Sequence, residues 1–221
     1  MNVYEVVMVS EYDQQINNNW ELTMKKILIA FSLLLASGFT LADQETYKID
    51  DSHSFINWTI RHVASKTSGT FSDVKGNILI DRKNLANSSI EAKISLLSVN
   101  SSHAKRDSHI QKDEYLDVGH FAEAQFVSSK VSANSDTEGT LTGKLTLHGV
   151  TKEISFPFKV LGFGADPFGG YRIGLEGHTS IKASDYGFAW PLKPNAPVGD
   201  DVELTLLIEG VRYYAEAKPL K

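Results

Sequence analysis

The chain has 221 residues, a formal net charge of −5 at pH 7, 42% hydrophobic residues and no cysteine. The lack of cysteine excludes disulfides and thiolate metal ligands, and the lack of any block of more than two lysines or arginines argues against nucleic-acid binding. A chain of this length can form one domain that is stabilised by packing and hydrogen bonds alone.

A secretory signal is predicted over residues 24–42. Residues 24–26 supply a positively charged start, an apolar run follows from Ile27 to Leu35, and small residues lead to Leu41-Ala42. This order is typical of a bacterial signal that is cleaved after Ala42, and it predicts a periplasmic protein. The apolar run is shorter than the ~20 residues that a bilayer span needs, so no stable membrane span is expected.

Of the two segments that flank this signal, only the one that follows it is expected to fold. Residues 1–23 are polar and rich in asparagine. We interpret them as lying outside the fold, either as the product of an over-long gene model or as a disordered extension. Residues 43–221 are expected to form the single folded domain.

Alternation of apolar and polar residues with a period of two dominates this domain and predicts half-buried strands. In chain order, the expected strands cover residues 55–62, 78–80, 89–96, 140–147, 153–160, 173–179 and 202–208. Gly, Asn and Asp turns separate them, which favours an all-β antiparallel meander, either a sandwich or a barrel. Pro157 lacks a backbone donor and therefore indicates an edge or a bulge in its strand.

Helical signals interrupt the strands at two places. Residues 102–115 combine Ser and Asp capping residues with the helix formers Ala104, Lys105 and Gln111, so a short helical insert is expected there. A second, shorter helical turn is expected at residues 63–68, directly after the first strand.

The apolar face of the strands must point inward if the sheet closes into a barrel. A barrel of ~8 strands either fills itself with side chains or holds one small ligand, and alternation alone does not decide between the two. The 11 phenylalanines of the chain favour a wall with internal space. The candidates for such a wall, each of which also suits an ordinary packed core, are Ile56, Trp58, Ile60, Phe71, Phe121, Phe126, Phe156 and Phe158.

Four blocks of sequence between about Tyr47 and Val211 have a recognisable pattern. They are Tyr47-Lys48-Ile49-Asp50 with His53-Ser54 and Ile56-x-Trp58-x-Ile60-x-His62; Arg106-Asp107-x-His109-Ile110 with Tyr115-Leu116-Asp117; Gly143 to Lys152; and Asp185-Tyr186-Gly187 with Val198-Gly199-Asp200-Asp201-Val202. Together they resemble the YceI family of polyisoprenoid-binding, lipocalin-like periplasmic proteins. The chain departs from the family pattern at Ala183, where arginine is usual, and at Leu116, where phenylalanine is frequent.

The resemblance implies an extended eight-stranded antiparallel lipocalin-like β-barrel with a short helical insert and a long apolar pocket. It also implies secretion to the periplasm and binding of a small amphiphilic lipid, either a polyprenyl lipid or an isoprenoid quinone. No catalytic residue is implied, and no cofactor other than this ligand. An exposed edge near Pro157, or the barrel rim, could support a homodimer.

Four residues are candidates for contact with the polar head of such a ligand or for the pocket rim: His62, Arg106, Asp107 and His109. Each also has a structural interpretation, since a histidine on a strand face is often a hydrogen-bonded rim residue and Arg106 with Asp107 could form a local network that pins the helix. An enzyme that uses His62, Asp107 or His109 as acid or base is the alternative function, and a non-binding stress-response protein with a filled barrel is a third.

Metal binding and nucleophilic catalysis find little support in the sequence. His103 and His109 are six residues apart and would not share one helix face, and no His-Glu-x-x-His motif is present. The chain also lacks a Gly-x-Ser-x-Gly elbow. We therefore expect no metal site and no catalytic residues.

Overall fold

The computed structural model describes residues 44–213, and the predicted signal segment and the segment before it lie outside the described residues. Within this range no helix is long and apolar enough to cross a bilayer. The main elements are β1 (Gln44–Ile49), β2 (Phe55–His62), β3 (Ser65–Phe71), β4 (Val74–Asp81), β5 (Ser89–Ser95), β6 (Val99–Asn100), α2 (Ala104–Ile110), β7 (Glu123–Ala133), β8 (Glu138–Leu147), β9 (Val150–Ala165), β10 (Tyr171–Lys182) and β11 (Val198–Arg212).

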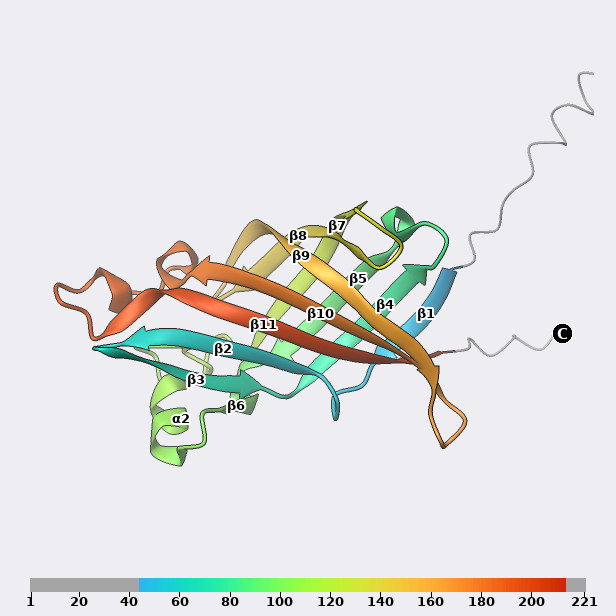
Figure 1. The fold of residues 1–221 in the computed structure, drawn as a ribbon. Helices are drawn as coiled ribbons and strands as arrows, with labels where there is room; N and C mark the ends of the chain where they lie inside the picture. Colours follow the sequence, from blue (N-terminus) through green and yellow to red (C-terminus); the bar gives the residue numbers. More distant parts are fainter. Residues whose placement is uncertain (1–43, 214–221) are drawn as a thin grey trace, which may run out of the picture. The chain divides into compact units, whose positions relative to one another are not determined.

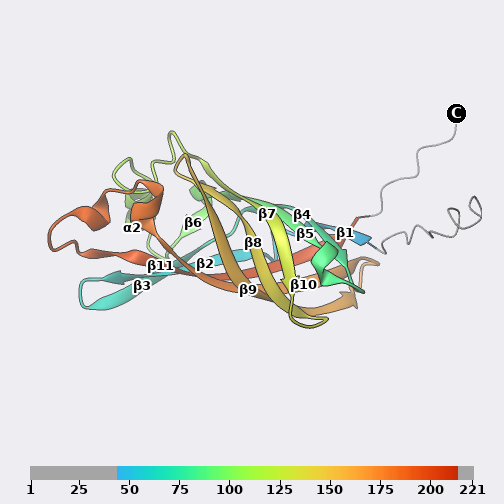
Figure 2. The same ribbon diagram turned by 90° about the horizontal axis from the view of Figure 1, so that it is seen from above.

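The strands form one antiparallel sheet in the order β1-β4-β5-β7-β8-β9-β10-β11-β2-β3-β6 (Figure 1). β1 also pairs with β11, and this contact closes eight strands into a barrel. Figure 2 shows β8 and β9 crossing in front of β2 and β11. The predicted eight-stranded antiparallel barrel with a short helical insert is confirmed.

Interrupted strands lengthen the barrel toward one end. β1 and β2 lie end to end along β11, since Ile49 pairs with Gly210 and Phe55 pairs with Leu207. β4 pairs with β1, and β3 pairs with β2. The barrel wall therefore extends beyond β1 and β4 on one side, as Figure 1 shows for β2 and β3 at its left.

The two ends of the barrel are named here by the segments that form them. The mouth, to which β2 and β3 extend, consists of the turn 63–64, the segment 101–122 with α2, the turn 148–149 and the loop 183–197. The base consists of the connections 82–88, 134–137 and 166–170.

Local predictions near the mouth differ from the structure. The helical turn expected at residues 63–68 is wrong, because Ser65–Phe71 pairs along its whole length with β2, and strand pairing overrides the local preference. The expected helix over 102–115 is shorter in the structure. His103 caps α2 by accepting from the backbone N–H of Arg106, and the helix ends at Ile110.

β7 was not predicted, and its ladder explains why. A register shift occurs between Ser128 and Lys130, so buried Phe126 and Val131 do not share one period of two. Pro157 behaves as an edge on one side, because the last β9–β10 pair is Phe158 with Gly177 and Pro157 lies one residue beyond it.

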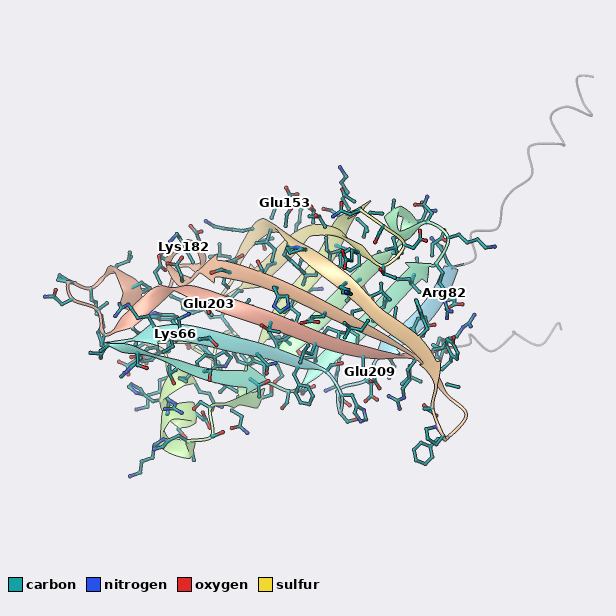
Figure 3. The ribbon with its side chains drawn as sticks, in the orientation of Figure 1. Lys66, Arg82, Glu153, Lys182, Glu203 and Glu209 are labelled. Atoms are coloured by element: carbon teal, nitrogen blue, oxygen red, sulfur yellow. The ribbon has the colours of Figure 1, made fainter. Side chains whose placement is uncertain are left out.

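The base is closed by a network around Arg82, which Figure 3 labels. The guanidinium carbon lies 3.8 Å from the ring centroid of Phe163, and Arg82 donates to the Glu45 carboxylate (Nη2–Oε2, 2.6 Å) and to the Tyr47 hydroxyl (2.9 Å). Tyr47 is fully buried and donates to Glu45. Burial, followed by the hydrogen bond to Glu45, raises the pKa of Tyr47 to about 12.

A second charged cluster joins the start of β10 to the end of β11. Arg172 donates to Asp50 (2.6 Å), to Asp166 (2.9 Å) and to Glu209, which Figure 3 labels. Burial raises the pKa of Asp50, but hydrogen bonds from Ser52, Arg172 and His53 outweigh it and hold this pKa well below its usual range. The cluster ties the connection between β1 and β2 to the barrel wall.

Replacing Asp50 with asparagine is expected to lower the free energy of unfolding at pH 7 by about 1–3 kcal/mol, because charge-assisted hydrogen bonds are lost. The folded-state pKa of Asp50 is depressed, so its stabilisation is present above an unfolded-state pKa of about 4 and is lost as the pH falls below that value. The difference between wild type and Asp50→Asn should therefore shrink from pH 5 to pH 2, measured by urea denaturation at each pH. Asp51→Asn, at an exposed neighbour, is the control, and an equal loss in both variants would contradict the assignment.

Candidate ligand-binding site

The barrel encloses a cavity of about 650 Å3. Its wall is made by the inward side chains of strands from β2 through β11, so it follows directly from the alternation that forms the strands. This volume lies within the ~300–1,000 Å3 that small-molecule sites occupy. The interior is thus hollow rather than filled, a question that the sequence left open.

The structure brings together seven of the eight residues predicted for the apolar wall. They are Ile56, Trp58 and Ile60 from β2, Phe71 from β3, Phe126 from β7, and Phe156 and Phe158 from β9. The rings of Phe126 and Phe156 lie 5.6 Å apart across the wall. Strand periodicity indicates the five positions on β2 and β9, which lie on the inner face of predicted strands, whereas Phe71 and Phe126 lie on β3 and β7, which the alternation did not predict.

Phe121 is the exception, because it does not line the cavity. Its ring lies 4.4 Å from that of His148, and it packs over Gly149. Phe121 belongs to the irregular part of the segment 101–122, where no strand period indicates which way a side chain points. Its role is to pack that segment against the turn between β8 and β9.

Several wall residues were missed by the sequence reasoning. The aliphatic members on predicted strands carried the signal of alternation and could have been listed with the aromatics; examples are Ile94, Leu141, Leu145, Leu204 and Leu206. Tyr115 and Trp190 also line the cavity, from the segment 101–122 and the loop 183–197. No local pattern distinguishes these two from ordinary loop residues.

The indole of Trp58 is seated against Gly69, its partner in the β2–β3 ladder. A Cβ at position 69 would lie 2.5 Å from the Trp58 ring and 2.6 Å from the Asn100 carbonyl oxygen. A larger residue at position 69 would therefore have to displace the indole of Trp58 or the backbone of β6.

Gly69→Ala is expected to displace the indole of Trp58 and to lower the free energy of unfolding by about 1–3 kcal/mol, as overpacking does elsewhere. Urea denaturation followed by tryptophan emission measures both effects. Gly164→Ala is the matched control, since no atom lies within 4 Å of a Cβ there. Equal stability and equal emission in the two variants would show that the contact at Gly69 does not constrain Trp58.

The predicted head-group residues separate at the mouth. His62, Arg106 and His109 line the cavity, and His103 and Lys105 join them there. Asp107 does not line it.

Asp107 instead accepts hydrogen bonds from the backbone N–H of Ser101 (2.8 Å) and from its hydroxyl group. Arg106 also donates to Ser101, from Nε to the hydroxyl oxygen Oγ (2.7 Å) and from Nη2 to the carbonyl oxygen (2.5 Å). Arg106 and Asp107 therefore hold α2 to the buried Ser101, in the local network that the sequence left as one alternative.

Six rings form a continuous row along the mouth, which we call the ring row. Centroid distances between neighbours run from 4.4 to 5.4 Å. In order, its members are Phe121, His148, Phe188, Trp190, Tyr115 and His109. The row joins the segment 101–122 to the turn 148–149 and to the loop 183–197.

Comparisons with known proteins agree with this geometry. A family model described as the YceI-like domain matches residues 47–210. A UPF0312 protein of Pseudomonas paraeruginosa is 40% identical over 195 residues, which cover 86% of this chain and 99% of that protein.

Two solved structures are similar in fold. BcnA of Burkholderia cenocepacia has a TM-score of 0.66 at 21% identity and covers 73% of this chain and 98% of its own. A polyisoprenoid binding domain from Saccharophagus degradans, implicated in plant cell wall breakdown, has a TM-score of 0.57 at 18% identity, with 76% and 98% covered. At these identities the likeness concerns the fold alone.

Proposed function

The chain belongs to the YceI-like family, and from this premise we propose that it binds an isoprenoid amphiphile inside its barrel and carries it through the periplasm. The ligand class is a polyprenyl lipid or an isoprenoid quinone. The observation that carries the proposal is the hollow, apolar interior of about 650 Å3, with polar side chains gathered at the mouth.

The physical argument rests on how such a ligand gains affinity. Each methylene group that leaves water contributes about 0.8 kcal/mol, so an isoprenoid tail needs an apolar wall and few polar contacts. A small number of polar groups then orients the ligand. In this barrel the wall runs from Trp58 to Phe158, and polar groups such as His62 and Arg106 stand at one end.

The periplasmic part of the proposal is supported by the sequence of residues 24–42, which has the order of a secretory signal. The fold of the Saccharophagus polyisoprenoid binding domain supports the ligand class. Acid–base catalysis by His62, Asp107 and His109 has less support, because Asp107 is bound to Ser101 and does not line the cavity.

Native mass spectrometry of the protein purified from its own periplasm, with extraction of any bound molecule, tests the proposal. We expect a polyprenyl or quinone species at one per chain. Repeated recovery of an empty barrel, with no uptake of added polyprenol or quinone, would overturn it. The same spectrum shows whether the protein forms the homodimer expected from the sequence.

A further inference from the structure

The polar part of the cavity lining is strongly biased in charge. Five side chains with basic groups line the cavity at the mouth: His62, His103, Lys105, Arg106 and His109. Glu176 is the one acidic residue of the lining within residues 44–213. Glu176 pairs with Leu207, and Leu207 pairs with Phe55 at the start of β2. Glu176 therefore lies far from His62, which ends β2 at the mouth. The mouth side of the lining is therefore basic only.

Two of these cations have no carboxylate partner in the described part of the chain. Lys105 is exposed and makes no ion pair there, and the guanidinium of Arg106 bonds only to Ser101, through Nε and Nη2. Its Nη1 makes no hydrogen bond within residues 44–213. By contrast, the arginines at the base are neutralised, Arg82 by Glu45 and Arg172 by Asp50 and others.

The histidines of the mouth add donors beside these cations. Nδ1 of His103 accepts from the backbone N–H of Arg106, so the proton of its neutral ring is on Nε2, which is a donor. His109 is bound to Glu114, which neutralises it when protonated. Within the described range Lys105 is therefore the cation without a bound carboxylate, and Arg106, which shares the Ser101 hydroxyl with Asp107, keeps a free Nη1.

Lys105 and the free Nη1 of Arg106 therefore offer positively charged donors at the edge of an apolar cavity, where an anionic group of a ligand can pair with them. A guanidinium whose orientation is fixed by Ser101 matches the oxygen geometry of a phosphate, and hydrogen bonds between ionised groups are the stronger ones. A quinone or an alcohol head carries no negative charge to pair with these donors. The geometry points to an isoprenoid ligand with a phosphate head, held by Lys105 and Arg106 while its tail fills the barrel; this inference rests on the proposed function.

Two probes with the same tail test the inference, geranylgeraniol and geranylgeranyl phosphate. Both tryptophans of the described range, Trp58 and Trp190, line the cavity, so their emission reports binding. We expect the phosphate to bind about tenfold or more tightly than the alcohol, as one charge-assisted contact would give. The preference should weaken at high salt, because part of the mouth is exposed.

Variants locate the preference. The ratio of the two affinities should fall toward one in Lys105→Gln and in Lys105→Gln/Arg106→Gln; the single variant keeps the bonds of Arg106 to Ser101 and so protects the fold. Lys66→Gln removes one exposed charge from the outside of β3, where Lys66 pairs with Glu203 (Figure 3), and should keep the ratio.

The outcomes separate the two proposals. Equal binding of both probes by the wild-type protein would overturn the phosphate head and leave the carrier function standing. An equal fall of the ratio in Lys66→Gln would also overturn it, since the preference would then be a general effect of charge. Binding of inorganic phosphate as tightly as geranylgeranyl phosphate would overturn it as well. Failure of both probes to bind would count against the carrier function itself.

Discussion

Replacing Tyr47 with alanine is expected to lower the free energy of unfolding by about 3–5 kcal/mol, the range for removal of a large buried side chain. Tyr47 has no exposed surface, and its hydroxyl lies between Glu45 and Arg82 at the base. The loss therefore combines a cavity in the core with a carboxylate and a guanidinium that lose a shared partner. Denaturation in urea, with fitted midpoint and slope, measures the effect.

Tyr47→Phe separates the two contributions. It keeps the ring and removes only the hydroxyl, so we expect a loss of about 0.5–1.5 kcal/mol, the usual value of one hydrogen bond. A loss in Tyr47→Phe as large as that in Tyr47→Ala would show that the network around Arg82, and not packing of the ring, holds the base together.

A bulky side chain placed inside the barrel is expected to weaken binding of an isoprenoid ligand strongly. Ala92 on β5 lines the cavity and is 9% exposed, so the indole of Ala92→Trp would occupy space that the ligand needs. If about four methylene groups are displaced at ~0.8 kcal/mol each, affinity falls about 100-fold. Titration with a polyprenol or a quinone, followed by isothermal calorimetry, gives this value directly.

Lys93→Trp provides the matched control. Lys93 is the next residue of the same strand, and its side chain is exposed on the outer face. This variant introduces the same indole without entering the cavity, and we expect it to bind as the wild type does. If Ala92→Trp is folded and binds equally well, the ligand must lie elsewhere on the molecule.

Regular strands made much of the fold predictable from the sequence. The period of two in β9 identified inward residues such as Phe156 and Phe158, because neighbouring side chains of a strand must point to opposite faces. The same rule failed in β7, where the register shift after Ser128 changes which residues point inward. Strand pairing also overrode the helical preference of residues 63–68.

The candidate site was predictable only in its wall. Whether the interior is hollow depends on the summed volumes of side chains from all strands, which no single stretch of sequence expresses. At the mouth, Phe121 and Trp190 lie on irregular segments, so their directions are set by the ring row and not by any local period. Asp107 looked like a ligand contact in the sequence and is instead bound to Ser101, six residues before it.

The ring row also has a consequence for the timing of ligand exchange. Because Tyr115 rests on Trp190, and Trp190 on Phe188, an outward swing of α2 must separate rings that belong to a second loop. A ligand that passes α2 therefore needs a concerted displacement of both segments, which is slower than the fluctuation of one free loop. For a ligand bound as proposed, the entrance then sets the residence time and the wall sets the affinity, so substitutions in the ring row are expected to change retention more than the binding equilibrium.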